Sequence, residues 1–352
     1  MSGERPERVE LAPGYSVSRV INGGWQLAAG HGAARGSREE RVRGLLRLAE
    51  RGFTTFDVAD IYTGVEELLG EVVRRWRRDG GGPPLRIHTK CVPDRAALSR
   101  LTRADVARTV ERSLARLGVE RLDLVQLHWW EYEVPGYVEA ALWLEALRRE
   151  GKIRLLGVTN FDRSRLAEML DAGAEIATIQ LQYSLLDRRP EGGMSRLCAQ
   201  RGVSMLAYGT LAGGYLGERW LGAPAPPAGS QENRSLTKYR LIVEEAGGWA
   251  RLQELLAATS EIGRRHGVSA ANVATRWVLE RSGVAAAILG ATSARHVEEN
   301  LRLFSFRLDE EDRALLTPLL AAAPGPRGDV YGLERHPGSP HRQILRTDLQ
   351  GA

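Results

Sequence analysis

The sequence has few cysteines and no long hydrophobic run. Cys91 and Cys198 are the only cysteines in 352 residues. They are too few for a disulfide framework, and no Cys/His cluster has the spacing of a zinc site, so we expect no metal. No run of about 18 apolar residues occurs, and the charged start of the chain lacks the apolar stretch of a signal peptide. These absences predict a cytoplasmic protein with no membrane association.

Lysine is scarce as well. Lys90, Lys152 and Lys238 are the only lysines among 49 basic residues, so arginine supplies almost every surface cation. The net charge of +5 does not indicate a nucleic-acid partner, because the arginines are spread along helical segments among Asp and Glu. A lysine in this chain therefore needs a specific reason, such as chemistry that a guanidinium cannot perform.

Short apolar or β-branched runs alternate with amphipathic helical segments from about residue 17, a pattern typical of a parallel sheet. Eight repeats of this unit predict an α/β protein, a closed (β/α)8 TIM barrel. We expect one domain over residues 1–352, with its core at about 17–322. The predicted strands are Arg19–Asn22, Thr54–Val58, Arg86–Lys90, Leu122–Leu127, Leu155–Val158, Ala177–Gln180, Ser204–Ala207 and Ala285–Leu289.

The segment 102–118 illustrates the helices. Its apolar residues recur at helical spacing from Val106 to Leu117, Thr102 can cap its start with Asp105 three residues on, and Gly118 ends it. Similar stripes occupy residues 38–51, 137–149 and 164–171, each between two predicted strands.

Two segments interrupt the alternation. Residues 212–248, after the seventh strand, are rich in Gly, Pro and Ser and longer than an ordinary loop, so we interpret them as a lid over the site. The tail 323–352 is compatible both with disorder and with folding across one end of the barrel.

Polar residues end three consecutive predicted strands, where TIM barrels carry their active sites. They are Asp57, with Tyr62 five residues on, then Lys90 and His128. A carbonyl that accepts a hydride needs a proton donor and hydrogen-bond partners for its oxygen. Tyr62 can donate the proton, an adjacent Lys90 ammonium would lower its pKa, Asp57 would keep that ammonium charged, and His128 can orient the carbonyl.

Each of these residues alone has a structural alternative. Asp57 and Lys90 can form an ordinary ion pair, Tyr62 can be a packing residue, and His128 a core histidine. Their joint occurrence at consecutive strand ends favours a catalytic role.

With this tetrad the chain resembles the aldo-keto reductase superfamily, whose catalytic residues are Asp, Tyr, Lys and His in this order and at similar spacing. The resemblance spans about residues 17–322 and includes the stretches GKIRLLGVTNF at 151–161, IQLQYSLLDRRPE at 179–191, LAYGTLAGG at 206–214 and ILGATSARHVEEN at 288–300. It implies an oxidoreductase that converts an aldehyde, ketone or sugar-type carbonyl to an alcohol, or the reverse, with a nicotinamide cofactor.

The resemblance also implies where the cofactor binds. Thr159, Asn160 and Gln180 would hold the nicotinamide carboxamide, Tyr208 would stack on the ring, and Gly24, Trp25 and Asp57 would border it. Gly209, Leu211 and Gly213 match the strap over the pyrophosphate, where glycine allows close backbone approach. The adenosine end would contact Gly290, Thr292, Ser293, Arg295, His296, Glu299 and Asn300.

Cofactor preference is less defined than cofactor type. Ser293 can cap the following helix, whose free N–H groups would suit a phosphate. NADPH-specific relatives carry lysine at Gly290 and arginine at His296, which this chain lacks, but Arg295 can take the phosphate role. We therefore favour NADP(H), with NAD(H) as the alternative.

Aromatic residues follow two of the strands. Trp25, Trp129 and Trp130 are expected to line a substrate pocket with Tyr62 and His128, although such residues can also pack the helix layer. The alternative function is a regulatory barrel that holds NADP(H) as a redox sensor with little turnover. Reduction of a conjugated C=C bond is disfavoured, because the related enzymes that perform it carry glutamate in place of His128. The substrate, the direction of the reaction and the oligomeric state are not predicted.

Overall fold

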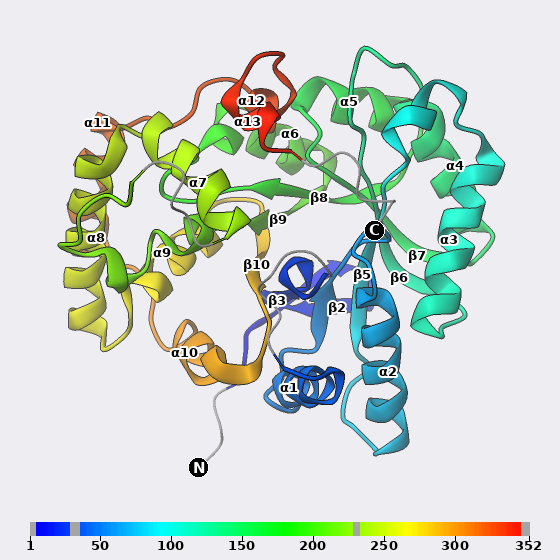
Figure 1. Ribbon diagram of the computed structural model, residues 1–352, viewed down its shortest axis with the longest axis horizontal. Helices are drawn as coiled ribbons and strands as arrows, with labels where there is room; N and C mark the ends of the chain where they lie inside the picture. The colour runs from blue at the N-terminus through cyan, green and yellow to red at the C-terminus, as the bar shows by residue number, and fades with distance from the viewer. Residues whose placement is uncertain (1–4, 29–35, 228–232, 346–352) are drawn as a thin grey trace.

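Eight parallel strands close into a barrel at the centre of the computed structural model, which describes residues 5–28, 36–227 and 233–345. Around the barrel the order is β10-β3-β4-β5-β6-β7-β8-β9, so the predicted (β/α)8 TIM barrel is confirmed (Figure 1). All eight predicted strands are present, with bounds that differ by a few residues: β3 (Val20–Gly23), β4 (Thr55–Asp57), β5 (Arg86–Cys91), β6 (Leu122–Leu127), β7 (Ile153–Thr159), β8 (Ile176–Gln182), β9 (Ser204–Tyr208) and β10 (Val284–Gly290).

The helices form an outer ring around these strands (Figure 1). The helix expected at 102–118 is α3, where the Thr102 hydroxyl accepts a hydrogen bond from the backbone N–H of Asp105, and Gly118 ends the helix at φ 65°. Glycine adopts this left-handed conformation without steric cost. The helices are α1 (Arg38–Glu50), α2 (Val65–Arg78), α3 (Arg103–Leu117), α4 (Tyr137–Arg149), α5 (Arg163–Asp171), α6 (Met194–Arg201), α7 (Arg234–Glu245), α8 (Gly248–His266), α9 (Ala270–Leu279), α10 (Val297–Arg302), α11 (Glu310–Ala322), α12 (Gly332–Arg335) and α13 (Pro340–Gln343).

A two-stranded hairpin that the sequence did not predict precedes the barrel. Its strands are β1 (Arg8–Ala12) and β2 (Tyr15–Ser18), and β2 leads directly into β3. Tyr15 is fully buried, and its hydroxyl lies 3.1 Å from Nε2 of His88 in β5. Leu11 and Val17 join one apolar cluster with Leu124 and Leu206 of the barrel strands. The hairpin therefore fills the N-terminal end of the barrel and leaves the opposite mouth for a site.

The segment expected to be a lid contains a helix. Within residues 212–248, of which 228–232 lie outside the described residues, α7 begins after Asn233, whose side chain accepts a hydrogen bond from the backbone N–H of Leu236. The Tyr239 ring of α7 presses on the glycine-rich turn after β9, and a Cβ added at Gly213 would lie 2.7 Å from that ring. Through α7, the segment therefore packs closely against the turn and is not simply an open loop.

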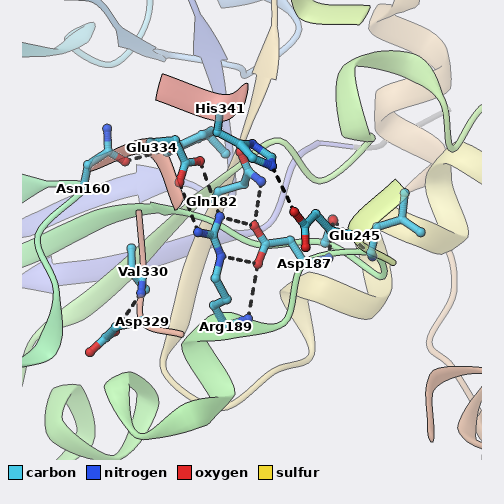
Figure 2. Close-up of polar contacts among 12 residues, drawn as sticks. Asn160, Gln182, Asp187, Arg189, Glu245, Asp329, Val330, Glu334 and His341 are labelled. Atoms are coloured by element: carbon cyan, nitrogen blue, oxygen red, sulfur yellow. Dashed lines mark hydrogen bonds and ion pairs between the residues drawn. The ribbon is translucent and has the colours of Figure 1, made fainter. Parts of the chain in front are cut away.

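The described part of the tail, residues 323–345, folds onto the barrel through a buried ionic cluster (Figure 2). Arg189 donates to both carboxylate oxygens of Asp187, at 2.9 and 2.7 Å, and its Nη1 lies 3.1 Å from Glu334 of α12. The three side chains are 2%, 0% and 1% exposed. Gln182 donates to Asp187 at 2.6 Å, and His341 of α13 lies 3.6 Å from Glu245 of α7. Of the two structures compatible with the sequence, the ordered tail is the one observed; residues 346–352 lie outside the description.

We expect Glu334→Ala to release the tail. Removing one partner of a buried ion pair costs about 3 kcal/mol, because Arg189 keeps its charge without its full set of partners. Trypsin cleavage after Arg335 and Arg342, followed by mass spectrometry, should accelerate by about tenfold or more as local opening becomes easier.

The matched control is Glu311→Ala. Glu311 pairs with Arg265 at 2.7 Å, but its side chain is 74% exposed, so its loss should leave tail cleavage unchanged. Equal cleavage rates in the two variants would show that the buried cluster does not hold the tail.

Candidate active site

A buried ion pair forms the base of the open barrel mouth. Lys90, at the end of β5, donates to Oδ2 of Asp57 and to the carbonyl of Val58, both at 2.7 Å. The Lys90 and Asp57 side chains are each 6% exposed. The two residues end neighbouring parallel strands, as the sequence predicted, and the pair fixes the ammonium at one position.

The second oxygen of Asp57 is also occupied. Oδ1 accepts hydrogen bonds from Nε2 of Gln126, at 2.9 Å, and from Nε2 of Gln180, at 2.6 Å. Gln126 was not predicted as a site residue. It lies two positions before His128 in β6, so strand alternation, which directs both side chains to the barrel interior, could have identified it. The carboxylate is thus held by three donors from three different strands.

Tyr62 lies in the turn after β4, and its ring centroid is 5.3 Å from Nζ of Lys90. Burial, followed by the charges of Asp57 and Asp60, raises the pKa of Tyr62 well above its usual value. The net direction is therefore opposite to the expected lowering. The physical reason is that burial and the two nearby carboxylates disfavour the charged phenolate in the protein without a ligand. The phenol is held in its protonated form, which is the form that donates a proton.

His128 is buried at the end of β6. Its Nδ1 lies 3.4 Å from the carbonyl of Thr159, and its ring meets Trp130 edge to face, with centroids 4.7 Å apart. Burial, with a smaller effect of the Arg335 charge, lowers the pKa of His128 to about 3. The ring is neutral near pH 7. A neutral ring carries one hydrogen, either on Nδ1, which faces the Thr159 carbonyl, or on Nε2.

A cavity of about 1070 Å³ opens above these residues. Nearly all predicted site residues line it: Trp25, Asp57, Tyr62, Lys90, His128, Trp130, Thr159, Asn160, Gln180, Tyr208, Gly209, Leu211, Gly213, Gly290, Thr292, Ser293, Arg295, His296 and Asn300. The segments that the sequence singled out therefore supply lining residues in or after every strand of the barrel.

Three predicted residues lie elsewhere. Trp129 is fully buried in the helix layer, where its Nε1 donates to the carbonyl of Val134, which corrects its expected place in the substrate pocket. Gly24 does not line the cavity, and a Cβ added there would lie 2.9 Å from the Val58 side chain. Glu299 accepts hydrogen bonds from Ser269, at 2.8 Å, and lies 3.0 Å from Nδ1 of His296.

The charges that line the cavity are unevenly distributed. Asp57 is the one acidic side chain among the described lining residues, and it is bound to Lys90. The further cations come from the segments after β9 and β10: Arg219, Arg234, Lys238 and Arg295. That half of the cavity suits an anionic ligand, whereas the half after β3 to β6 does not.

Several lining residues were not predicted. Lys238 and Tyr239 of α7 face the cavity, with the Lys238 ammonium 5.0 Å from the Tyr208 ring centroid. The scarcity of lysine was the available signal for Lys238. Tyr331 of the tail also lines the cavity, and its ring lies 6.0 Å from that of His128. No sequence pattern connects residue 331 to the barrel mouth.

A sequence model of the Aldo/keto reductase family matches residues 19–321, which covers most of the chain and every strand of the barrel. The chain belongs to the aldo/keto reductase family. The expected family and fold are therefore confirmed. The protein is an oxidoreductase, and members of this family use nicotinamide cofactors.

Individual relatives are distant. Flagellar radial spoke protein 5 of Chlamydomonas reinhardtii is 30% identical, over 68% of this chain and 56% of its own length. The NADH-specific methylglyoxal reductase of Escherichia coli is 26% identical, over 87% of this chain and 96% of its own length. A crystal structure of an aldo/keto reductase from Klebsiella pneumoniae with NADP and acetate has a TM-score of 0.67 and 25% identity, and covers 92% of this chain and 98% of its own.

None of the helices in the described residues is long and apolar enough to cross a membrane.

The lowered pKa of His128 predicts a pH dependence of stability. An unfolded histidine titrates near 6.5, whereas the folded ring stays neutral to about pH 3. The unfolded chain therefore binds a proton that the folded chain does not, and stability falls as the pH falls below 6.5. At pH 5, protonation of His128 in the unfolded chain should therefore lower the free energy of unfolding by about 2 kcal/mol relative to its value well above pH 6.5.

Urea unfolding at pH 7 and pH 5 checks this expectation. His128→Asn removes the titrating group, so the variant should lose less stability than the wild type over this interval, whatever its stability at pH 7. Equal losses would mean that His128 is protonated in the folded protein.

Proposed function

We propose that the chain is an NADP(H)-dependent enzyme that reduces an aldehyde, ketone or sugar-type carbonyl to an alcohol, or catalyses the reverse oxidation. The observation that carries the proposal is the fixed Asp57–Lys90 pair beneath a protonated Tyr62, with the neutral His128 at the same mouth. This set offers a proton donor and a hydrogen-bond donor to one oxygen atom.

The proposed roles follow from the chemistry of each group. The bound nicotinamide would supply or accept the hydride. Tyr62 gives its proton to the oxygen as negative charge develops there, and Lys90, 5.3 Å from the ring centroid, stabilises the phenolate that remains. Asp57 keeps Lys90 charged. His128, with its hydrogen on Nε2, orients the carbonyl.

The residues present fit a dinucleotide cofactor. Asn160, at φ 63°, accepts a hydrogen bond from the Tyr208 hydroxyl at 2.8 Å. An amide side chain and an aromatic ring are thus held together where the nicotinamide ring and its carboxamide would lie. Thr159 and Gln180 border the same place. The glycines at 209 and 213, both at positive φ, allow a backbone strap, and the cations after β9 and β10 match a pyrophosphate.

Arg295 supports the preference for NADP(H). It follows Ser293, whose hydroxyl accepts a hydrogen bond from the Arg295 backbone N–H, and its Nη2 lies 3.0 Å from Nε2 of His296. Its side chain is on the rim of the cavity, where a 2′-phosphate could pair with it. A side chain at Gly290 would displace the end of the Gln26 side chain, because a Cβ added there would lie 2.0 Å from Oε1 of Gln26.

Tyr62→Phe tests the catalytic role. The variant keeps the ring but loses the proton, so kcat for reduction of a carbonyl should fall by about a hundredfold or more. The Kd for NADPH, followed by quenching of tryptophan fluorescence, should change by less than about twofold. Retained turnover would exclude Tyr62 as the donor. A wild-type protein that binds NADPH but reduces no carbonyl would instead favour the redox-sensor alternative.

Arg295→Leu tests the cofactor preference. Loss of one charge-assisted contact should raise the Kd for NADPH by about tenfold and leave the Kd for NADH nearly unchanged. Arg302→Leu, an exposed arginine of the following helix α10, is the matched control and should affect neither constant. Equal effects on both cofactors would exclude a contact with the 2′-phosphate.

A further inference from the structure

Lys238 of α7 differs from the other two lysines in its surroundings. Lys90 is bound to Asp57 at 2.7 Å, and Lys152 pairs with Glu111 on the surface. Within the part of the chain that the structure describes, Lys238 makes neither a hydrogen bond nor an ion pair. Because arginine supplies nearly every other cation of this chain, a lysine that faces the cavity needs a role that a guanidinium cannot fill.

Aromatic rings take the place of a carboxylate next to Lys238. Its ammonium lies 5.0 Å from the ring centroid of Tyr208 and 5.3 Å from that of Tyr239. An aromatic face attracts a cation, but it does not replace the acceptors that an ammonium has in water or in an ion pair. The charged form of Lys238 is therefore less well stabilised than that of Lys90.

The charged groups around Lys238 do not compensate for its burial. Burial is the largest effect and lowers the pKa of Lys238; Glu334 and Asp187 oppose this lowering, and Arg189 adds to it. Both carboxylates are bound to Arg189 in the tail cluster (Figure 2). Near pH 7 the neutral amine, which is the nucleophilic form, is therefore more populated at Lys238 than in an ordinary exposed lysine.

The positions next to this amine suit an anionic ligand. Arg234 lies one helical turn before Lys238, so the two side chains share the face of α7 that lines the cavity. Arg219 lines the cavity as well, from the segment after β9. Guanidinium groups match the geometry of a phosphate. A phosphorylated aldehyde held by these arginines would therefore place its carbonyl group within reach of the Lys238 amine.

We propose that Lys238 is a site of covalent modification, at which its amine captures a phosphorylated aldehyde as an imine when the cofactor is absent. The Nζ lone pair adds to the carbonyl carbon, and the C=O π pair moves to oxygen. Both amine hydrogens then leave with that oxygen as water, and the C=N bond remains. Nothing is oxidised or reduced in this step.

The adduct occupies the half of the cavity that we assign to the pyrophosphate, so the aldehyde and the dinucleotide exclude each other. An aldehyde would therefore inhibit the enzyme reversibly when the cofactor is scarce, because hydrolysis of the imine restores the free amine. The imine step does not depend on carbonyl reduction, whereas its control by the cofactor rests on the proposed function.

The test uses pyridoxal 5′-phosphate as the probe, without cofactor, and borohydride to fix the imine as a secondary amine. Arginines flank each lysine, so the three lysines fall in separate tryptic peptides and mass spectrometry assigns the adduct. Glu111 raises the pKa of Lys152. At pH 7, Lys238 should therefore react at least about tenfold faster than Lys152, since each unit of pKa changes the neutral fraction about tenfold.

Pyridoxal, which lacks the phosphate, should label Lys238 about tenfold more slowly than the phosphorylated probe does. Equal rates with the two probes would exclude recognition of the phosphate. Equal labelling of Lys238 and Lys152, or labelling at Lys90 alone, would overturn the assignment of Lys238.

Lys238→Arg is the matched variant, because it keeps the charge and removes the nucleophile. The visible absorbance of its imine should be about tenfold weaker than that of the wild type. Lys152→Arg should match the wild type within about twofold, since an exposed, paired lysine contributes little neutral amine. Full absorbance in Lys238→Arg would place the adduct on another residue.

Protection by NADP⁺, which cannot reduce the probe, separates this inference from the proposed function. Once tryptophan fluorescence shows NADP⁺ bound, a saturating concentration should slow labelling of Lys238 by about tenfold and leave Lys152 unaffected. Unchanged labelling of Lys238 would overturn the mutual exclusion. If Lys238 is labelled but the protein reduces no carbonyl, the modification site stands and the proposed function fails. If the protein reduces carbonyls with NADPH and Lys238 stays unlabelled, the site fails and the proposed function stands.

Discussion

The Asp57–Lys90 ion pair is the interaction on which the candidate site depends. Two charges that are each 6% exposed are costly to remove from water, and their attraction offsets that cost only when the remaining hydrogen-bonding groups are also satisfied. Here Val58 after β4, Gln126 of β6 and Gln180 of β8 satisfy them. The pair therefore depends on the closed sheet to bring these groups together. Its position fixes the Lys90 ammonium next to the proposed proton donor, Tyr62.

Much of this arrangement follows from the sequence, because a TIM barrel brings all its strand ends to one mouth. Asp57, Lys90 and His128 end successive strands, and no tertiary detail is needed to place them together. Alternation even continues past the end of β6. Trp129 is buried in the helix layer, whereas Trp130 lines the cavity with His128, so counting in twos from Gln126 separates the two tryptophans.

Other features depend on contacts between distant segments, which one sequence does not reveal. The pKa direction of Tyr62 follows from burial and from the charges of Asp57 and Asp60, not from spacing. The β1–β2 hairpin was missed because its two short strands gain stability from the barrel end that Tyr15 fills. Likewise, α7 is stabilised by packing of Tyr239 on a glycine turn, in a region whose composition indicates a loop.

Tyr331 follows every barrel strand in the sequence, and this order bears on how the cavity is assembled. Chains are synthesised from the N-terminus, and the segments made first can fold first. The strand ends that carry the proposed tetrad and the segments proposed to bind the cofactor all precede residue 301, whereas Tyr331 follows. A nascent barrel can therefore complete the proposed dinucleotide site before Tyr331 reaches its place 6.0 Å from the His128 ring.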